Sequence, residues 1–327
     1  MNREIIAKNT LKGNPVGYLQ FSPETRIPKG LPVIVIMHGR GEGGKDAGSV
    51  HALEKYAEKK NHAPWIIQNS AYIQSLQVVI LCTHMYKGFL ELQMKGLLEH
   101  IHEVYQPSGI ALTGYSQGAK NVLEAIEDEA CRKLFNVAVP LSTPKDLKGV
   151  IDVGEMAVWS LIGWNDETRM HNAKNMEFLT GAPNKMRKDV PRIKDNQSPE
   201  IDITVAYSLG LRKWIRIPIT TSDKNCQFVA TFYANRGHSI QDEVYNTPQV
   251  WEWMIAHCKG GDGEIPEEPK NPFADFTDPE LLMAERVLEI GANSFSPIAA
   301  DEKLLENVRK EIIQRIGPKL KELLRYE

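Results

Sequence analysis

The sequence predicts an α/β protein with a mostly parallel central sheet and helices on both faces. Several short runs are apolar at consecutive positions, among them residues 31–37 and residues 78–82 of the segment 77–82. Strands of this composition are covered on both faces, as in parallel sheets. Segments with helical periodicity separate these runs, which favours right-handed crossovers between neighbouring parallel strands. At 327 residues the chain is long enough to bury such a sheet.

The predicted elements follow one another along most of the chain. Residues 3–25 alternate apolar and polar side chains around a Gly-Asn pair, which indicates an opening hairpin or two edge strands. The remaining predicted strands are 31–37, 77–82, 110–112, 137–142, 157–163 and 228–233. The predicted helices are 52–60, 89–105, the segment that follows 118, and 248–257.

Residues from about 180 to about 222 depart from this rhythm and form an insertion before the last strand. The segment contains four prolines and includes a predicted strand pair at 203–207 and 214–217. One interpretation is a lid over a site, and the other is a solvated surface excursion. The cationic residues that bear on this choice are Arg187, Lys188, Arg192 and Lys194.

The chain divides into a main domain at residues 1–258, a linker at 259–274 and a helical extension at 275–327. The linker is rich in glycine, proline and acidic residues. The extension carries an apolar stripe at helical spacing, which must be buried somewhere. It either folds back on the main domain or serves self-association or docking. The stripe consists of Leu305, Val308, Ile312, Ile316, Leu320 and Leu323.

Composition narrows the function class. The net charge is −3 with 42% hydrophobic residues, so electrostatics disfavours nucleic-acid binding. No run resembles a secretory signal or a membrane span, and we expect a cytoplasmic protein, although an exported form without its leader would look the same. The four cysteines show no metal-ligand spacing, which indicates buried free thiols. We expect neither a metal nor a cofactor.

The segment 109–130 is central to the function. An apolar run leads into Gly114-Tyr115-Ser116-Gln117-Gly118, and a helical pattern follows. A bare G-x-S-x-G arises by chance in about one chain of ten at this length. Between a strand and a helix, however, it is typical of a turn that exposes its serine at the top of a sheet. Ser116 is therefore predicted to be a nucleophile near the positive end of the helix that follows.

A serine hydroxyl needs a base, and the base needs an orienting acid. In hydrolases with this turn, the chain order is serine, acid, histidine, with the acid and the histidine after late strands. His238 directly follows the strand 228–233 and is the predicted base. Asp166 follows the strand 157–163 and is the predicted acid. The alternative for Asp166 is that it caps a helix beginning near residue 168.

Other histidines and acids fit these roles less well. His38 ends a strand but belongs to a His-Gly turn, where we expect a structural hydrogen bond. Asp152 precedes its strand and would lie at the opposite edge, and Asp223 belongs to the insertion. Packing or surface positions are predicted for His62, His84, His100 and His102.

An oxyanion that forms during acyl transfer needs preorganised N–H donors. One predicted donor is the backbone N–H of Gln117, which follows the nucleophile. The other is the backbone N–H of Arg40, in the glycine-rich turn that follows the strand 31–37. A phosphate-binding loop is the alternative for that turn, but neither of the common phosphate-loop motifs is present.

Together these motifs resemble those of the α/β-hydrolase esterases. The similarity is to the phospholipase/carboxylesterase and predicted-peptidase branch, near the feruloyl-esterase-like and polyhydroxybutyrate-depolymerase-like enzymes. It covers residues from about 15 to 258 outside the insertion. The segments that carry it are 38–46, 114–119, 237–238, 245–248 and 251–254.

The resemblance implies an α/β-hydrolase fold with Ser116, Asp166 and His238 as a catalytic triad. It also implies an oxyanion hole formed by the amides of Arg40 and Gln117. The chain departs from the branch at Gln241, where a tryptophan is common, and in the long interval between the acid and the histidine.

The sequence therefore predicts a serine hydrolase that cleaves a carboxylic ester through an acyl-enzyme intermediate. The expected substrate carries a small or medium acyl group, or an acyl group on a sugar. A peptidase or a thioesterase would use the same residues. A hydrolase-fold scaffold without activity, which assembles through the C-terminal helices as an oligomer or with a partner, is the alternative from another class.

Overall fold

The computed structural model describes residues 1–8, 15–23, 29–40, 42, 49–84, 91–180, 203–207, 214–216 and 227–258. All of them lie within the first of two units into which the chain divides, Met1–Gly263 and Glu264–Glu327. The predicted linker and helical extension, with their apolar stripe, lie outside the described residues. The domain boundaries and the C-terminal docking element therefore stay predictions.

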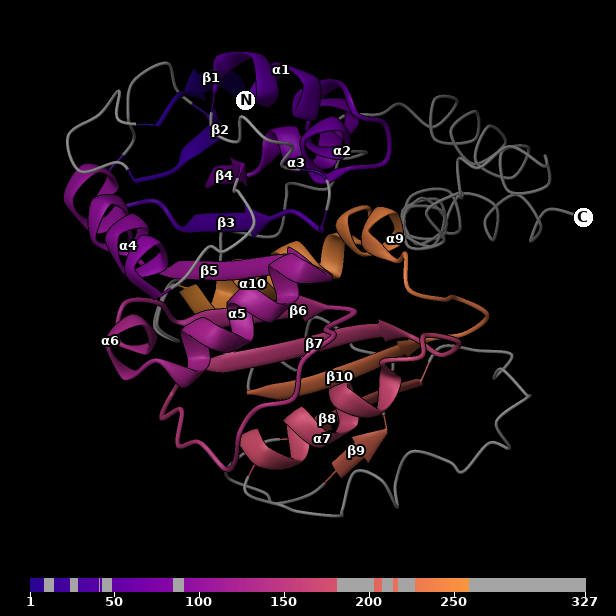
Figure 1. Ribbon diagram of the computed structural model, residues 1–327. Coiled ribbons are helices and arrows are strands. Elements are labelled where there is room, and N and C mark those ends of the chain that lie inside the picture. Colours follow the sequence, from indigo (N-terminus) through magenta and orange to yellow (C-terminus); the bar gives the residue numbers. More distant parts are fainter. Residues whose placement is uncertain are drawn as a thin grey trace, which may run out of the picture. The chain divides into compact units, whose positions relative to one another are not determined.

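One sheet of ten strands organises the described part of the chain, in the order β1-β2-β4-β3-β5-β6-β7-β10-β8-β9 (Figure 1). The six central strands are mutually parallel, and each end of the sheet carries two strands added in antiparallel pairing. The strands are β1 (Asn2–Ile6), β2 (Gly17–Ser22), β3 (Val33–Met37), β4 (Val79–His84), β5 (Ile110–Tyr115), β6 (Val137–Leu141), β7 (Ala157–Gly163), β8 (Ile203–Tyr207), β9 (Trp214–Arg216) and β10 (Phe228–Tyr233).

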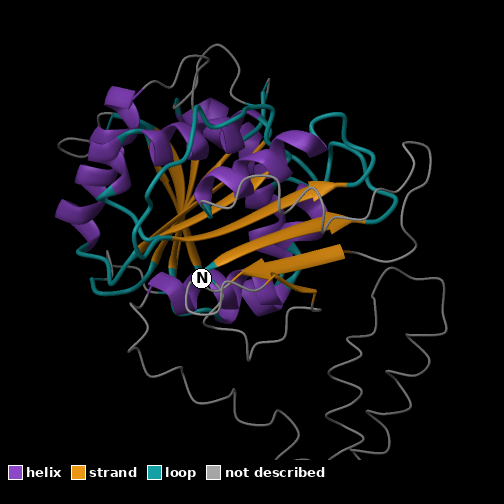
Figure 2. Ribbon diagram, turned by 90° about the horizontal axis from the view of Figure 1, so that it is seen from below, coloured by secondary structure: helices purple, strands orange, loops and turns teal. Residues whose placement is uncertain are grey.

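Helices cover both faces of this sheet, as Figure 2 shows. One face is covered by α4 (Glu91–Tyr105), α5 (Gln117–Glu127), α6 (Glu129–Arg132) and α7 (Arg169–Leu179). The other is covered by α1 (Val50–Glu58), α2 (Ala63–Asn69), α3 (Ala71–Ser75), α9 (Gln241–Tyr245) and α10 (Pro248–Cys258). The prediction of a mostly parallel sheet between two helical layers is confirmed.

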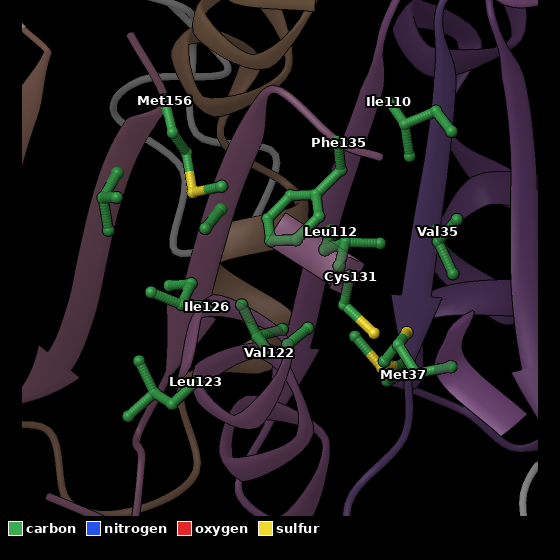
Figure 3. Packing of buried hydrophobic residues seen from close by; sticks show 14 of the residues in the cluster. Val35, Met37, Ile110, Leu112, Val122, Leu123, Ile126, Cys131, Phe135 and Met156 are labelled. Atoms are coloured by element: carbon green, nitrogen blue, oxygen red, sulfur yellow. The ribbon is translucent and has the colours of Figure 1, made fainter. Parts of the chain in front are cut away.

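The consecutive apolar residues of β3 divide between the two layers. Val35 and Met37 belong to the cluster that includes α5, whereas Ile34 and Ile36 belong to the cluster that includes α10. Figure 3 shows Val35 and Met37 in their cluster together with Val122 of α5. Each fully buried side chain of this size stabilises the fold by about 1.5–3 kcal/mol. An unbroken apolar run is thus the sequence of a strand buried on both faces.

The predicted edge elements are present as strands. Strands β1 and β2 pair antiparallel, which confirms the two opening strands. The pair at 203–207 and 214–217 forms β8 and β9, and β8 pairs antiparallel with β10. This part of the insertion therefore widens the sheet. The four cationic residues named for the lid interpretation, at positions 187, 188, 192 and 194, lie outside the described residues.

Two further features concern the described residues alone. Cys82, Cys131 and Cys258 are buried free thiols, as predicted, and Cys226 lies outside the described residues. None of the helices in the described part of the chain combines the length and the hydrophobicity that a membrane span requires.

The strand order reverses direction around β3. The chain runs from β3 to β4 on one side and then crosses to β5 on the other, after which β6 and β7 follow outward. In sheets of this kind, ligands bind at the carboxyl ends of the strands beside such a switch point. The carboxyl ends of β3 and β5 are therefore where a site is expected.

Candidate active site

The predicted site residues all follow the carboxyl ends of parallel strands. Arg40 comes three residues after β3, Ser116 directly after β5, Asp166 three residues after β7 and His238 five residues after β10. Parallel strands end at the same edge of a sheet, so the fold gathers residues that are distant in the sequence.

Ser116 lies on a strained turn between β5 and α5. Its backbone angles are φ 53° and ψ −108°, a conformation that residues with a side chain rarely adopt. The turn is held because the Ser116 N–H donates to the Leu141 carbonyl at 2.9 Å, while the Ser116 carbonyl accepts from Lys120 N–H at 3.0 Å. Hydrogen bonds to β6 on one side and to the first turn of α5 on the other therefore maintain the strained backbone conformation of Ser116.

The two glycines of the motif allow strand β5 and helix α5 to pack closely. A Cβ on Gly118 would lie 2.1 Å from the carbonyl oxygen of Met37, at the end of β3. A Cβ on Gly114 would lie 2.6 Å from the backbone of Gly118. Both contacts are with backbone atoms, which cannot move aside without disrupting the sheet. The motif is thus a packing requirement as well as a functional one.

Ser116, His238 and Asp166 form a continuous chain of hydrogen bonds. Ser116 Oγ lies 2.9 Å from His238 Nε2, and His238 Nδ1 lies 2.8 Å from Asp166 Oδ2. An ionised carboxylate can only accept, so the proton of the neutral imidazole is on Nδ1 and Nε2 is available to accept from the serine hydroxyl. The structure therefore brings together the three residues that the sequence singled out.

Asp166 is held on both of its oxygens. While Oδ2 faces His238, Oδ1 accepts from the backbone N–H and the hydroxyl of Thr168, each at 2.8 Å. Burial raises the pKa of Asp166, but the hydrogen bonds from His238 and Thr168 outweigh it and leave the pKa below its usual value. Thr168 is the N-cap residue of α7, so Asp166 braces the residue before the helix and is not itself the cap.

The imidazole of His238 is partly exposed and lies against the ring of Tyr115, with ring centroids 5.3 Å apart. The hydrogen bond to Asp166 raises the pKa of His238, partly offset by burial. A base with a raised pKa binds a proton more readily, which suits a group that must take one from an alcohol.

Two residues that the sequence analysis did not single out position the loop of His238. Ser142, directly after β6, is fully buried with φ 49°, and its hydroxyl donates to the carbonyl of His238 at 2.7 Å. A Cβ on Gly163 would lie 2.1 Å from the carbonyl oxygen of Gly237, so the loop packs directly on the end of β7. A serine or a glycine after a strand is common, and no local pattern distinguishes these two.

The two predicted oxyanion donors come from neighbouring strands. Gln117 is the first residue of α5, where helix geometry leaves backbone N–H groups without an acceptor inside the helix. Arg40 follows Gly39, whose backbone packs closely against the ring of Tyr115. A Cβ on Gly39 would lie 2.8 Å from that ring. Their roles as donors to an oxyanion remain a proposal.

The other histidines have partners of their own. His38 Nδ1 donates to the Gly39 carbonyl at 2.7 Å, which confirms the expected structural hydrogen bond. The ring nitrogens of His62, His84, His100 and His102 lie within hydrogen-bonding distance of Glu42 Oε1, the Glu42 carbonyl, Tyr18 Oη and the Leu134 carbonyl, respectively. These contacts agree with packing or surface roles.

Comparison with protein-family models gave no match, and neither did comparison with curated proteins. Among solved structures, the chain is similar to a thermostable esterase at 15% identity and a TM-score of 0.44, covering 77% of this chain and 62% of that one. An acetyl xylan esterase from Aspergillus awamori is 12% identical with a TM-score of 0.43, and the match covers 77% of this chain and 100% of that one. A feruloyl esterase module from Clostridium thermocellum is 11% identical with a TM-score of 0.42, and the match covers 78% of this chain and 88% of that one. The chain thus spans less than two thirds of the first of these proteins.

The topology itself identifies the fold. A mostly parallel sheet crosses over around β3, and a strained serine turn joins its central strand β5 to α5. An acid and a histidine follow later strands in the order that this architecture uses. The chain therefore has the α/β-hydrolase fold.

Proposed function

We propose that this protein is a serine hydrolase that cleaves a carboxylic ester through an acyl-enzyme intermediate, with residues 1–258 as its catalytic domain. The observation that carries the proposal is the hydrogen-bonded series Ser116 Oγ, His238 and Asp166, with the serine on a strained turn at the switch point of the sheet. Strain that the surrounding structure maintains is typical of functional sites.

In the acylation step, Ser116 Oγ attacks the carbonyl carbon of the ester while His238 Nε2 takes the hydroxyl proton. The carboxylate of Asp166 stabilises the imidazolium that forms. The carbonyl oxygen becomes an oxyanion, to which the backbone N–H groups of Gln117 and Arg40 donate. The tetrahedral intermediate then collapses, its bond to the alkoxy oxygen breaks, and His238 gives its proton to the departing alcohol.

Deacylation repeats the same steps with water as the nucleophile. His238 takes a proton from a water molecule as the water oxygen attacks the acyl carbon. Collapse of the second tetrahedral intermediate breaks the bond to Ser116 Oγ, which recovers its proton from His238. The products are a carboxylic acid and the free enzyme. The residues described supply every proton transfer in this cycle.

The substrate that we propose carries a small or medium acyl group, or an acyl group on a sugar. Peptides and thioesters react through the same steps, so the leaving group has to be tested directly. A panel of p-nitrophenyl acetate, p-nitrophenyl butyrate, an acetylated sugar, an acyl thioester and a peptide anilide compares these classes at one enzyme concentration. We expect the esters to give the highest kcat/KM.

The test of the reaction combines turnover with labelling of the serine. The wild-type protein should hydrolyse p-nitrophenyl acetate and react with a fluorophosphonate probe, with the label on the peptide that contains Ser116. Ser116→Ala should abolish the labelling and lower kcat by up to about 10⁶-fold. Ser75→Ala serves as the matched control, because the exposed Ser75 hydroxyl donates only to a carbonyl of its own helix among the described contacts.

The opposite result is equally clear. A folded wild-type protein that neither turns over any member of the panel nor takes the label would refute the hydrolase proposal. It would favour the scaffold interpretation instead. Turnover that persists in Ser116→Ala would refute the role of this serine.

A further inference from the structure

Glu42 is a buried carboxylate beside the site that the proposed reaction does not use. Only 7% of its side chain is exposed, and its Oε1 lies 3.1 Å from Nδ1 of His62. Its Oε2 is buried and has no hydrogen-bond partner among the residues that the structure describes. Burying a carboxylate is costly unless the group is paired, and removing its partner leaves that cost uncompensated.

The carboxylate touches the turn that carries Arg40. A Cβ on Gly39 would lie 3.3 Å from Glu42 Oε1, so this oxygen lies against the backbone of the turn. The backbone of Glu42 closes the turn, because its N–H donates to the Gly39 carbonyl at 3.4 Å. His84 Nε2 donates to the Glu42 carbonyl at 3.0 Å. Glu42 is therefore held through its N–H, its carbonyl and its side chain, with Arg40 between it and Gly39.

The contact with His62 reaches the other catalytic loop. His62 immediately precedes α2, and its Nδ1 also lies 3.3 Å from the side-chain amide of Gln241. Gln241 begins α9, three residues after His238. It is also the position at which the chain departs from the branch that it resembles. A single ring nitrogen cannot both donate to Glu42 and accept from Gln241, so Gln241 lies beside the hydrogen bond between Glu42 and His62 rather than extending it. These contacts still place the turn after β3 next to the segment after β10.

The charges around Glu42 keep it ionised. Burial raises the pKa of Glu42, but the hydrogen bond and charge of His62 lead the interactions that lower it below its usual value. Burial lowers the pKa of His84 to about 4, so that ring is neutral near pH 7. The other titratable groups that interact with Glu42 are His38, Lys59, Tyr56, Tyr115 and Tyr245.

We propose that Glu42 is a positioning residue: its hydrogen bond with His62, beside Gln241, fixes the Gly39–Glu42 turn so that the Arg40 amide points at the oxyanion. This inference rests on the proposed function. The oxyanion exists only in the tetrahedral intermediates and the transition states that lead to them. A displaced donor should therefore lower kcat and leave KM nearly unchanged.

The experiment measures kcat and KM for p-nitrophenyl acetate in four variants and the wild type. Removal of one oxyanion donor lowers kcat by about 10²- to 10³-fold, so a donor that is only misplaced should lower it by about 10- to 100-fold. We expect this loss in Glu42→Ala, with KM changed less than about twofold. Glu42→Gln should recover most of the activity, because its amide oxygen still accepts from His62.

His62→Ala should give a similar loss, and the double variant Glu42→Ala/His62→Ala should be little worse than either single one, because both act through one contact. His62→Ala also keeps the test open if Glu42→Ala does not fold. The matched control is Asp146→Ala, which removes another carboxylate paired with a histidine, since Asp146 contacts His171 and also Lys174. Its kcat should equal that of the wild type.

Three results would overturn the positioning role: an unchanged kcat in Glu42→Ala, a raised KM with unchanged kcat, or a Glu42→Gln variant as poor as Glu42→Ala. The failure of the proposed function looks different. An inactive wild-type protein refutes ester hydrolysis and this inference with it, whereas an active wild type with an unaffected, folded Glu42→Ala refutes only the inference.

Discussion

Replacing Asp166 by asparagine is a sharp perturbation of the proposed mechanism. It removes the negative charge and replaces one acceptor oxygen with an NH₂ donor, while the shape of the side chain is kept. Asp166 Oδ1 accepts from both the N–H and the hydroxyl of Thr168, and Oδ2 faces His238 Nδ1. In Asp166→Asn the amide oxygen should stay with the Thr168 donors, which turns the NH₂ group towards His238. Nδ1 must then accept, and the imidazole proton moves to Nε2.

The magnitude follows from these contacts. The flipped amide, which would restore the productive tautomer, leaves two partly buried donors of Thr168 facing its NH₂ group, at about 1 kcal/mol or more each. The wrong tautomer therefore dominates, and Nε2 can no longer take the proton of Ser116. With the carboxylate charge also gone, we expect kcat to fall by about 10⁴-fold, or ~5.5 kcal/mol of transition-state stabilisation.

The assay is kcat/KM for p-nitrophenyl acetate as a function of pH. The base must be neutral, so activity rises with pH through the pKa of His238, which the hydrogen bond to Asp166 raises. The acidic limb of the wild type should lie above the ordinary histidine value of about 6.5, and that of Asp166→Asn should lie lower.

The matched control for this prediction is Asp152→Asn. The Asp152 carboxylate accepts only from the Gly154 N–H among the described contacts, and it precedes the amino end of β7, at the opposite edge from the site. Its profile should match that of the wild type. An Asp166→Asn variant that retains kcat within about tenfold, or whose acidic limb does not move, would refute the assigned role of the acid.

The remaining predictions concern packing, backbone strain and linkage. Gly118→Ala places a Cβ 2.1 Å from the Met37 carbonyl oxygen and should lower the free energy of unfolding by about 3 kcal/mol or more. In the control Gly149→Ala, the new Cβ has nothing within 4 Å, and the free energy should change by less than about 0.5 kcal/mol. Equal urea midpoints and slopes for the two variants would contradict this prediction. Ser142→Ala and Ser142→Gly both lose the hydrogen bond to the His238 carbonyl, but glycine adopts φ 49° more readily than alanine. The glycine variant should therefore be more stable by about 1 kcal/mol in the same urea assay. The reverse order of stability would show that the backbone at this position is not strained. The pKa of His238 is raised in the folded protein, so this residue contributes stability that is present below its unfolded pKa and is lost as pH rises through its folded pKa. The Tm difference between wild type and His238→Gln should therefore be larger at about pH 5.5 than at about pH 8.5. Equal differences at the two pH values would count against the pairing of His238 with Asp166.

Much of the fold could be predicted from the sequence because burial on both faces leaves a simple signature. The run 31–37 is apolar throughout, and the strand within it, Val33–Met37, sends alternate side chains into two different helical layers. The G-x-S-x-G motif predicted a close approach of strand and helix, and the contacts at Gly114 and Gly118 explain why glycine is needed. Chain order then restricted the partners of Ser116, because few acids or histidines directly follow a strand.

The contacts that support the site were not predictable in the same way. Ser142 reaches a carbonyl 96 residues away, and its positive φ has no counterpart in a local pattern. The contacts of His62 with Glu42 and Gln241 bring together three segments whose approach depends on the sheet order. For Asp166, the sequence offered a choice between orienting a histidine and capping a helix. One carboxylate oxygen faces His238, and the other accepts from Thr168, which is itself the N-cap residue of α7.

The most direct test of the account is to trap the acyl group during turnover. The wild-type protein is mixed with p-nitrophenyl butyrate, quenched in acid and digested, and the peptides are weighed by mass spectrometry. The account predicts a butyryl group on the peptide that contains Ser116, which disappears in Ser116→Ala. Steady turnover with the butyryl group on a different residue, or with no acylated peptide under conditions where acylation is faster than hydrolysis, would contradict it.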